Sequence, residues 1–149
     1  MNYEYREKQY DFNGFNVIIT GGRVKIGYAT VLKFLRSGAN VILTTRFPAL
    51  ALEQLKSEED YDNWVERLTV YGLDLRSLNA VNSFLDFCKS GLKSVDVLIN
   101  NAAQTIKYPI EYYEPLISRE QKLLKNHTYS NLLENKVPAT FQEKKLLPV

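Results

Sequence analysis

The sequence is poor in the residues that disulfide frameworks and metal sites require. Its 149 residues include one cysteine, Cys88, which excludes an internal disulfide and a multi-cysteine metal site. Cysteine this scarce is typical of a reducing compartment. The single histidine, His127, has no acid pair or cysteine beside it, and such a histidine is much more often a surface residue than a ligand or a base. We therefore expect no metal site.

Long apolar runs and an excess of one charge are missing too. No apolar run approaches the length of a membrane span, and residues 1–11 are charged and tyrosine-rich, without the apolar region of an export signal. The 19 basic and 17 acidic residues leave a net charge of +2, too balanced to indicate a nucleic-acid or membrane surface. We expect a cytoplasmic protein that binds neither nucleic acid nor membranes. Any phosphate binding must then be confined to one site, and residues 1–11 are expected to form an N-terminal extension.

The rest of the sequence alternates between short apolar runs and helical patterns. Strands are expected at 15–20, 40–45, 68–75 and 95–100, and helices at 26–35, 49–56 and 77–91. Strands that alternate with helices predict right-handed crossovers and a parallel sheet covered on both faces. We expect a Rossmann-like, doubly wound α/β domain over 12–110, truncated after about four strands. A helical or irregular tail, 111–149, follows it.

A glycine-rich segment, "TGGRVKIGY", joins the first strand to the first helix. Gly21, Gly22 and Gly27 lie at a turn where unpaired N–H groups and the helix dipole favour an anion. The alternative is a tight turn that only packs the helix on the sheet. Lys25 carries a Cβ, so its backbone has two alternatives. It can keep an ordinary negative φ, in which case the ammonium group can reach a phosphate. Otherwise it adopts a positive φ and accepts strain of about 1–3 kcal/mol.

The second strand ends in "TTRFP", which places Arg46 where a dinucleotide site recognises the adenosine ribose. No acid occurs between Asp11 and Glu53, so a 2′-phosphate is favoured and NADP is expected in preference to NAD. Arg23 and Lys25 add positive charge on the same side of the sheet. The alternative is that Arg46 is a solvated strand-end arginine.

Three segments resemble motifs of the short-chain dehydrogenase/reductase family. "TGGRVKIGYA" is similar to its TGxxxGxG cofactor loop, "GLDL" to its acidic turn, and "LINNAAQ" to its NNAG motif, in the right order over about residues 12–110. Gly21 and Gly27 match the first and third glycines of the loop, and Lys25 replaces the second. The resemblance implies an NADP(H)-binding oxidoreductase domain with these cofactor-binding residues: Gly21, Gly22, Arg23, Lys25, Ile26, Gly27, Arg46, Asp74, Leu75, Asn100, Ala102 and Ala103.

The resemblance also implies roles within that set. The Gly22 to Val24 segment and Ile26 would line the pyrophosphate and the nicotinamide ribose. Asp74 would accept a hydrogen bond from the adenine amino group, with Leu75 packed alongside. Three of the four residues of the NNAG-like segment, Asn100, Ala102 and Ala103, would run past the adenine-ribose side and hold the central sheet together.

The family's catalytic residues are not found in this sequence. They are a serine and a tyrosine followed four residues later by a lysine, and none of the ten tyrosines has a lysine at that spacing. We therefore assign no catalytic residue. Asn126 is either the family's helix asparagine or a plain polar helix residue, and Tyr112 and Tyr113 either stack on a cofactor or, as we favour, cover the sheet.

Two functions remain open. The first is the cofactor-binding half of a short-chain reductase that depends on sequence absent here for turnover. The second is a non-catalytic NADP(H)-binding or protein-interaction module. The fourth strand would be an apolar edge in either case, so we expect the tail, a second copy of the chain or a completing partner chain to cover it.

Overall fold

Four parallel strands form one sheet in the computed structural model, which describes residues 10–103, 108–126 and 133. Their order is β3-β2-β1-β4, so the chain turns back at β1 to place its fourth strand on the opposite side. The strands are β1 (Asn16–Thr20), β2 (Asn40–Thr45), β3 (Leu68–Gly72) and β4 (Val97–Asn100). All four predicted strands are present, and β3 and β4 are shorter than expected.

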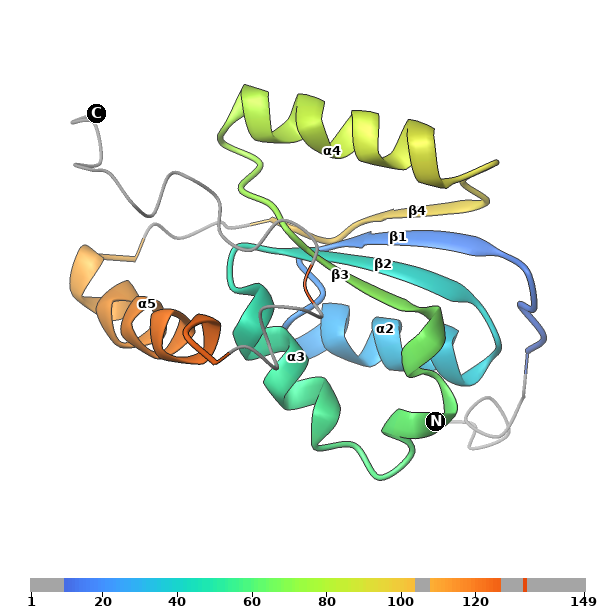
Figure 1. Cartoon of the computed structure of the whole chain (residues 1–149), viewed down its shortest axis with the longest axis horizontal. Helices are drawn as coiled ribbons and strands as arrows, with labels where there is room; N and C mark the ends of the chain where they lie inside the picture. Colours follow the sequence, from blue (N-terminus) through green and yellow to red (C-terminus); the bar gives the residue numbers. More distant parts are fainter. Residues whose placement is uncertain (1–9, 104–107, 127–132, 134–149) are drawn as a thin grey trace, which may run out of the picture.

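Helices cover both faces of the sheet, as the doubly wound prediction requires. Figure 1 shows α2 and α3 on one face, α4 on the other, and α5 beside α3. The α-helices are α2 (Lys25–Arg36), α3 (Pro48–Lys56), α4 (Leu78–Gly91) and α5 (Ile110–Leu124), and two 3-10 turns are η1 (Tyr61–Asn63) and η2 (Val65–Arg67). The Rossmann-like α/β fold class is therefore confirmed.

Two apolar cores lie on the two faces of the sheet. Successive strand residues point to opposite faces, so Val17 and Ile19 join the core under α2 and α3 while Ile18 joins the core under α4. Burial on both faces explains why β1 reads as a continuous apolar run. Cys88 lies in the α4 core.

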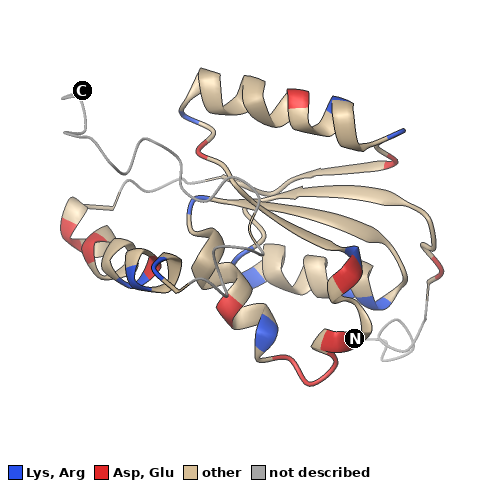
Figure 2. Cartoon of the chain, in the orientation of Figure 1, with Lys and Arg blue, Asp and Glu red and all other residues tan. Residues whose placement is uncertain are grey.

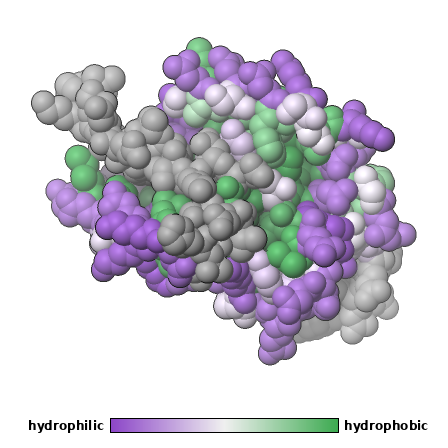
Figure 3. All heavy atoms as spheres, viewed as in Figure 1, coloured by the Kyte–Doolittle hydropathy of each residue, from purple (hydrophilic) through white to green (hydrophobic). Residues whose placement is uncertain are grey.

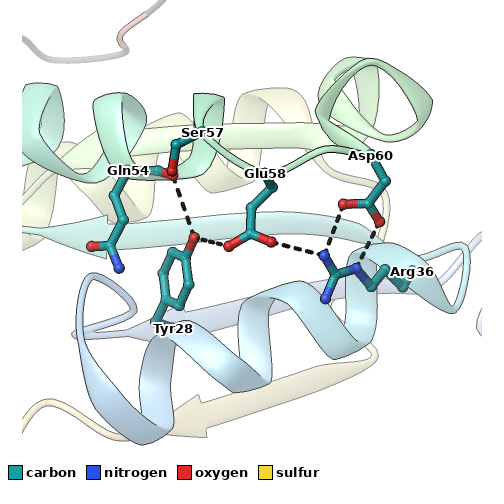
Figure 4. Close-up of polar contacts among 6 residues, drawn as sticks. All are labelled: Tyr28, Arg36, Gln54, Ser57, Glu58 and Asp60. Atoms are coloured by element: carbon teal, nitrogen blue, oxygen red, sulfur yellow. Dashed lines mark hydrogen bonds and ion pairs between the residues drawn. The ribbon is translucent and has the colours of Figure 1, made fainter.

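A polar network joins α2 to the segment after α3 (Figure 4). The Tyr28 hydroxyl donates a hydrogen bond to Glu58, and Arg36 donates to Glu58 at 2.9 Å and to Asp60 at 2.7 Å. These contacts fix the two helices of one face against each other.

The β4 strand lies at an edge of the sheet, as predicted. Within the described part of the chain it pairs with β1 alone, and Leu98 is 57% exposed. Leu85, on α4, and Val95, just before β4, are also exposed, and Figure 3 shows apolar surface between α4 and α2. The described residues leave this edge open.

The described part of the tail is helical and docks on α3. The N–H groups of Ala49 and Leu50, at the start of α3, donate to the buried Glu120 carboxylate at 2.7 and 2.8 Å. Arg119 forms an ion pair with Glu53. Helix α5 therefore lies on the α2 and α3 face, opposite α4.

Candidate functional site

A cleft of about 510 Å³ opens at the carboxyl ends of the strands. It lies where the strand order reverses between β1 and β4, the position at which open α/β sheets bind ligands. Ten of the twelve predicted site residues line it: Gly21, Arg23, Lys25, Ile26, Gly27, Arg46, Asp74, Leu75, Ala102 and Ala103.

Two positions of the loop require glycine, because other parts of the chain lie too close to leave space for a Cβ. Gly21 has φ +69°, and a Cβ there would lie 3.0 Å from Cα of Ala102. A Cβ on Gly27 would collide with the Gly21 carbonyl oxygen and lie 2.5 Å from the Asn101 side-chain nitrogen. The loop therefore closes tightly on the turn after β4.

Gly22 and Asn100 are the two predicted residues that do not line the cleft. A Cβ on Gly22 would enter the core against Leu43 and Val31, so this glycine packs the loop on the sheet. Asn100 is the last residue of β4, paired in register with Thr20, and it is exposed.

Lys25 adopts the strained alternative. Its φ is +51°, in the left-handed region that a residue with a Cβ rarely enters. It is the first residue of α2, and its side chain is exposed beside the cleft. The glycine that the family motif has at this position would adopt this backbone without strain.

The α2 N-terminus differs from those of α3 and α4. Glu120 accepts from the first turn of α3, and the Ser77 hydroxyl accepts from the Ala80 N–H at the start of α4. Val24, which precedes α2, makes no side-chain cap, and the first turn of α2 holds no acid. The first N–H groups of α2 and their partial positive charge therefore face the cleft with neither a capping side chain from Val24 nor an acid in their own turn.

Two residues that sequence reasoning missed hold the loop against the turn after β4. The Thr20 hydroxyl accepts from the N–H groups of Asn101 and Ala102, each at 3.1 Å, and the Asn101 side chain donates to the Gly21 carbonyl at 3.1 Å. Asn101 is the second asparagine of the NNAG-like segment. Its position in that motif was the available signal.

Basic residues gather at this end of the sheet, around the starts of α2 and α3 (Figure 2). Arg46 follows β2 and is half-buried; its guanidinium carbon lies 5.8 Å from the Phe47 ring centre and 5.1 Å from that of Tyr113. The Arg23 guanidinium carbon lies 5.4 Å from the Phe47 ring centre. Burial lowers the pKa of Arg23 from its usual value, and the like charge of Arg46 adds a smaller effect in the same direction.

Asp74 follows β3, lines the cleft and is 1% exposed. Both of its carboxylate oxygens accept from Arg76, whose Nε lies 2.9 Å from Oδ1. The hydrogen bond with Asp74 raises the pKa of Arg76. The buried carboxylate therefore already has a cation, which the sequence analysis did not anticipate.

Within residues 10–103, 108–126 and 133, no group of three or more histidine, cysteine, aspartate and glutamate side chains is placed to hold a metal ion. No described helix is long and apolar enough to cross a membrane. His127 and most of the tail lie outside the described residues, and Asn126 is exposed just after α5. Tyr113 contacts Arg46, and Tyr112, its neighbour, is 52% exposed.

The model of the short chain dehydrogenase family matches residues 16–120, more than half of the chain. The chain belongs to this family. The match contains all four strands and reaches into α5, so the resemblance stated from the sequence is confirmed.

Individual relatives agree with the family match. The chain is 39% identical over 108 residues to uncharacterized protein R665 of Acanthamoeba polyphaga mimivirus, covering 69% of this chain and 23% of that protein. It is 30% identical over 122 residues to the chloroplastic chlorophyll(ide) b reductase NOL of Oryza sativa subsp. japonica, covering 80% of this chain and 33% of that protein. The chain thus spans a third or less of the length of these curated relatives.

A solved structure shares the fold. L-Sorbose reductase from Gluconobacter frateurii, crystallised with NADPH and L-sorbose, superposes with a TM-score of 0.57 at 22% identity, over 78% of this chain and 47% of that one.

Proposed function

We propose that this chain is the NADP(H)-binding domain of a short-chain oxidoreductase. The observation that carries the proposal is the joint position of Arg46 and the uncapped α2 N-terminus in one cleft at the strand-order reversal. A helix N-terminus suits a pyrophosphate, and an arginine at the end of the second strand suits a 2′-phosphate.

The residues of the cleft fit a dinucleotide. Gly21 and Gly27 let the loop close against the turn after β4, and the first turn of α2 then lines the cleft, where a pyrophosphate can approach its N–H groups. Arg23 and Lys25 supply positive charge next to the pyrophosphate position and would hold an anion at the start of α2. Ile26 lines the same loop.

The adenosine end of the ligand would lie between β2 and β3. We assign Arg46 to the 2′-phosphate and Asp74, Leu75 and Arg76 to the adenine side, with Ala102 and Ala103 completing the wall after β4. NADPH supplies a hydride when bound; the protein's part is to bind and orient it.

Turnover needs groups that this sequence does not contain at the family's spacing. No tyrosine is followed four residues later by a lysine, so we infer that carbonyl reduction depends on residues supplied from outside these 149. A second candidate, a non-catalytic NADP(H)-binding or interaction module, is favoured by the open β4 edge, which offers a surface to a second copy or a completing chain.

The test is Arg46→Ala, with the dissociation constants of NADPH and NADH measured by calorimetry. The variant loses charge-assisted hydrogen bonds to the 2′-phosphate worth about 1.5–3 kcal/mol, so NADPH binding should weaken by about 10- to 100-fold. NADH binding should change little. Lys89→Ala, which removes an exposed charge at the end of α4, is the matched control; equal losses for both cofactors at Arg46→Ala would contradict the assignment.

A further inference from the structure

Arg46 lies in a row of aromatic and basic side chains that begins just before α5, at Tyr108. The Tyr108 and Tyr112 rings stack with centres 4.4 Å apart, and Tyr112 meets Tyr113 edge to face at 5.2 Å. Tyr113 then contacts the Arg46 guanidinium, which also contacts Phe47. Two rings from different elements therefore flank the arginine assigned to the 2′-phosphate.

The fold holds Tyr113 in this position. Tyr113 and Glu120 are seven residues apart on α5, so they lie on the same helix face. Glu120 binds the first N–H groups of α3, the helix that begins two residues after Arg46. The same docking that anchors α5 therefore sets Tyr113 against Arg46.

A second cation lies within electrostatic reach of the same tyrosine. The pKa of Arg76 is raised chiefly by its hydrogen bond to Asp74, and Tyr113 adds a smaller electrostatic effect in the same direction. Arg46 and Arg76 both line the cleft. Tyr113 thus lies near the two arginines at the end of the cleft assigned to adenosine.

An aromatic contact changes what an arginine can do. A free arginine side chain loses about 2 kcal/mol of rotamer entropy when it is fixed. A guanidinium that rests on a ring has part of that freedom removed before a ligand arrives, and its in-plane N–H groups still point outward to a phosphate.

We propose that Tyr113 is a positioning residue that sets the preference of the cleft for NADP(H) over NAD(H), by holding Arg46 for the 2′-phosphate. This inference rests on the proposed function. It makes α5 part of the cofactor site, although α5 contributes no residue to the cleft lining.

The experiment measures dissociation constants for NADPH and NADH, and the melting temperature, for the wild type and Tyr113→Ala, Tyr113→Leu and Tyr113→Phe. For the alanine and leucine variants we expect NADPH binding to weaken about three- to tenfold, with NADH changed less than twofold. The phenylalanine variant keeps the ring and should retain the wild-type ratio. Leucine keeps apolar bulk, so it reports on the ring even where alanine loosens α5.

Ser118→Ala is the control for a change on α5, because it removes an exposed side chain of that helix without a change of charge and should leave the NADPH to NADH ratio unchanged. In an Arg46→Ala background, Tyr113→Leu should produce no further loss of NADPH affinity. A wild type that binds neither cofactor would overturn the proposed function and this inference together. A wild type that prefers NADPH, with an unchanged ratio in Tyr113→Leu, would overturn this inference alone.

Discussion

Lys25 occupies a backbone position that suits glycine. Its φ of +51° is imposed by the loop, since Gly21 and Gly27 on either side are held by close approach to the turn after β4. A non-glycine residue in the left-handed region costs about 1–3 kcal/mol. The chain accepts this strain at the mouth of the cleft, where a lysine also adds positive charge.

Lys25→Gly should separate strain from charge. Removal of the Cβ should raise the free energy of unfolding by about 1 kcal/mol, or the melting temperature by about 2–4 °C for a chain of this size. Lys25→Ala keeps the Cβ and should show no such gain, whereas both variants should weaken NADPH binding alike because both lose the ammonium. The strain account fails if thermal unfolding finds the glycine variant no more stable than the alanine variant.

Residue positions next to strand ends were predictable, and contacts across the chain were not. Arg46 and Asp74 each follow a strand of the parallel sheet. Because the carboxyl ends of parallel strands lie at the same edge of a sheet, both residues line the cleft. The bond between Asn101 and Gly21 spans 80 residues, and Arg46 meets Tyr113 through the docking of α5. The motif could have singled out Asn101 as a residue, but neither periodicity nor motif spacing shows which residue it or Arg46 contacts.

At the scale of elements, α5 supplies the cap that α3 lacks. Phe47, at the N-cap of α3, offers no side-chain acceptor, and the buried Glu120 accepts from two N–H groups of the first turn instead. Burial raises the pKa of Glu120, while these two bonds and Arg23 act in the opposite direction. A helical pattern in the tail predicts a helix but not which neighbouring helix it caps.

Glu120→Ala should destabilise the protein by about 1–3 kcal/mol, because it leaves buried N–H groups of α3 without their acceptor. Arg119→Ala, on the same helix, removes an exposed ion pair with Glu53 and should cost less than about 1 kcal/mol. Urea unfolding of the two variants compares them directly. Equal losses would mean that the cap does not anchor α5.

The polar network between α2 and the segment after α3 should make the stability of the protein depend on pH under acidic conditions. The hydrogen bond from Arg36 lowers the pKa of Asp60 from 3.8 to about 2. An acid whose pKa is depressed by folding stabilises above its unfolded pKa, so this contribution should be lost as the pH falls from about 4 to about 2. Asp60→Asn should flatten the dependence of the melting temperature on pH in that window, and an unchanged slope would show that Asp60 does not contribute to it.

At the scale of the whole molecule, the strand order leaves β4 at an edge. The sequence predicted this edge, because in this fold further strands normally pair on the far side of the fourth and no strand is predicted after it. The sequence has no pattern that shows whether the tail, a second copy or a partner chain covers the edge. The exposed Leu98 makes the edge a candidate for self-association.

Leu98→Lys should therefore reduce self-association. We expect light scattering to find the wild type as a dimer or a larger species at tens of micromolar, and the variant as a monomer with a similar melting temperature. Leu78→Lys, at an exposed leucine that begins α4, is the control for added charge. A monomeric wild type would mean that the edge is not used between copies of this chain.

The central claim is that the cleft between β1 and β4 binds NADP(H). The most direct test is calorimetric titration of the folded wild-type chain with NADPH and then with NADH in the same buffer. We predict micromolar binding of NADPH and at least tenfold weaker binding of NADH, since only NADPH carries the 2′-phosphate assigned to Arg46. No heat of binding with either cofactor, from a chain with a cooperative thermal transition, would contradict the account.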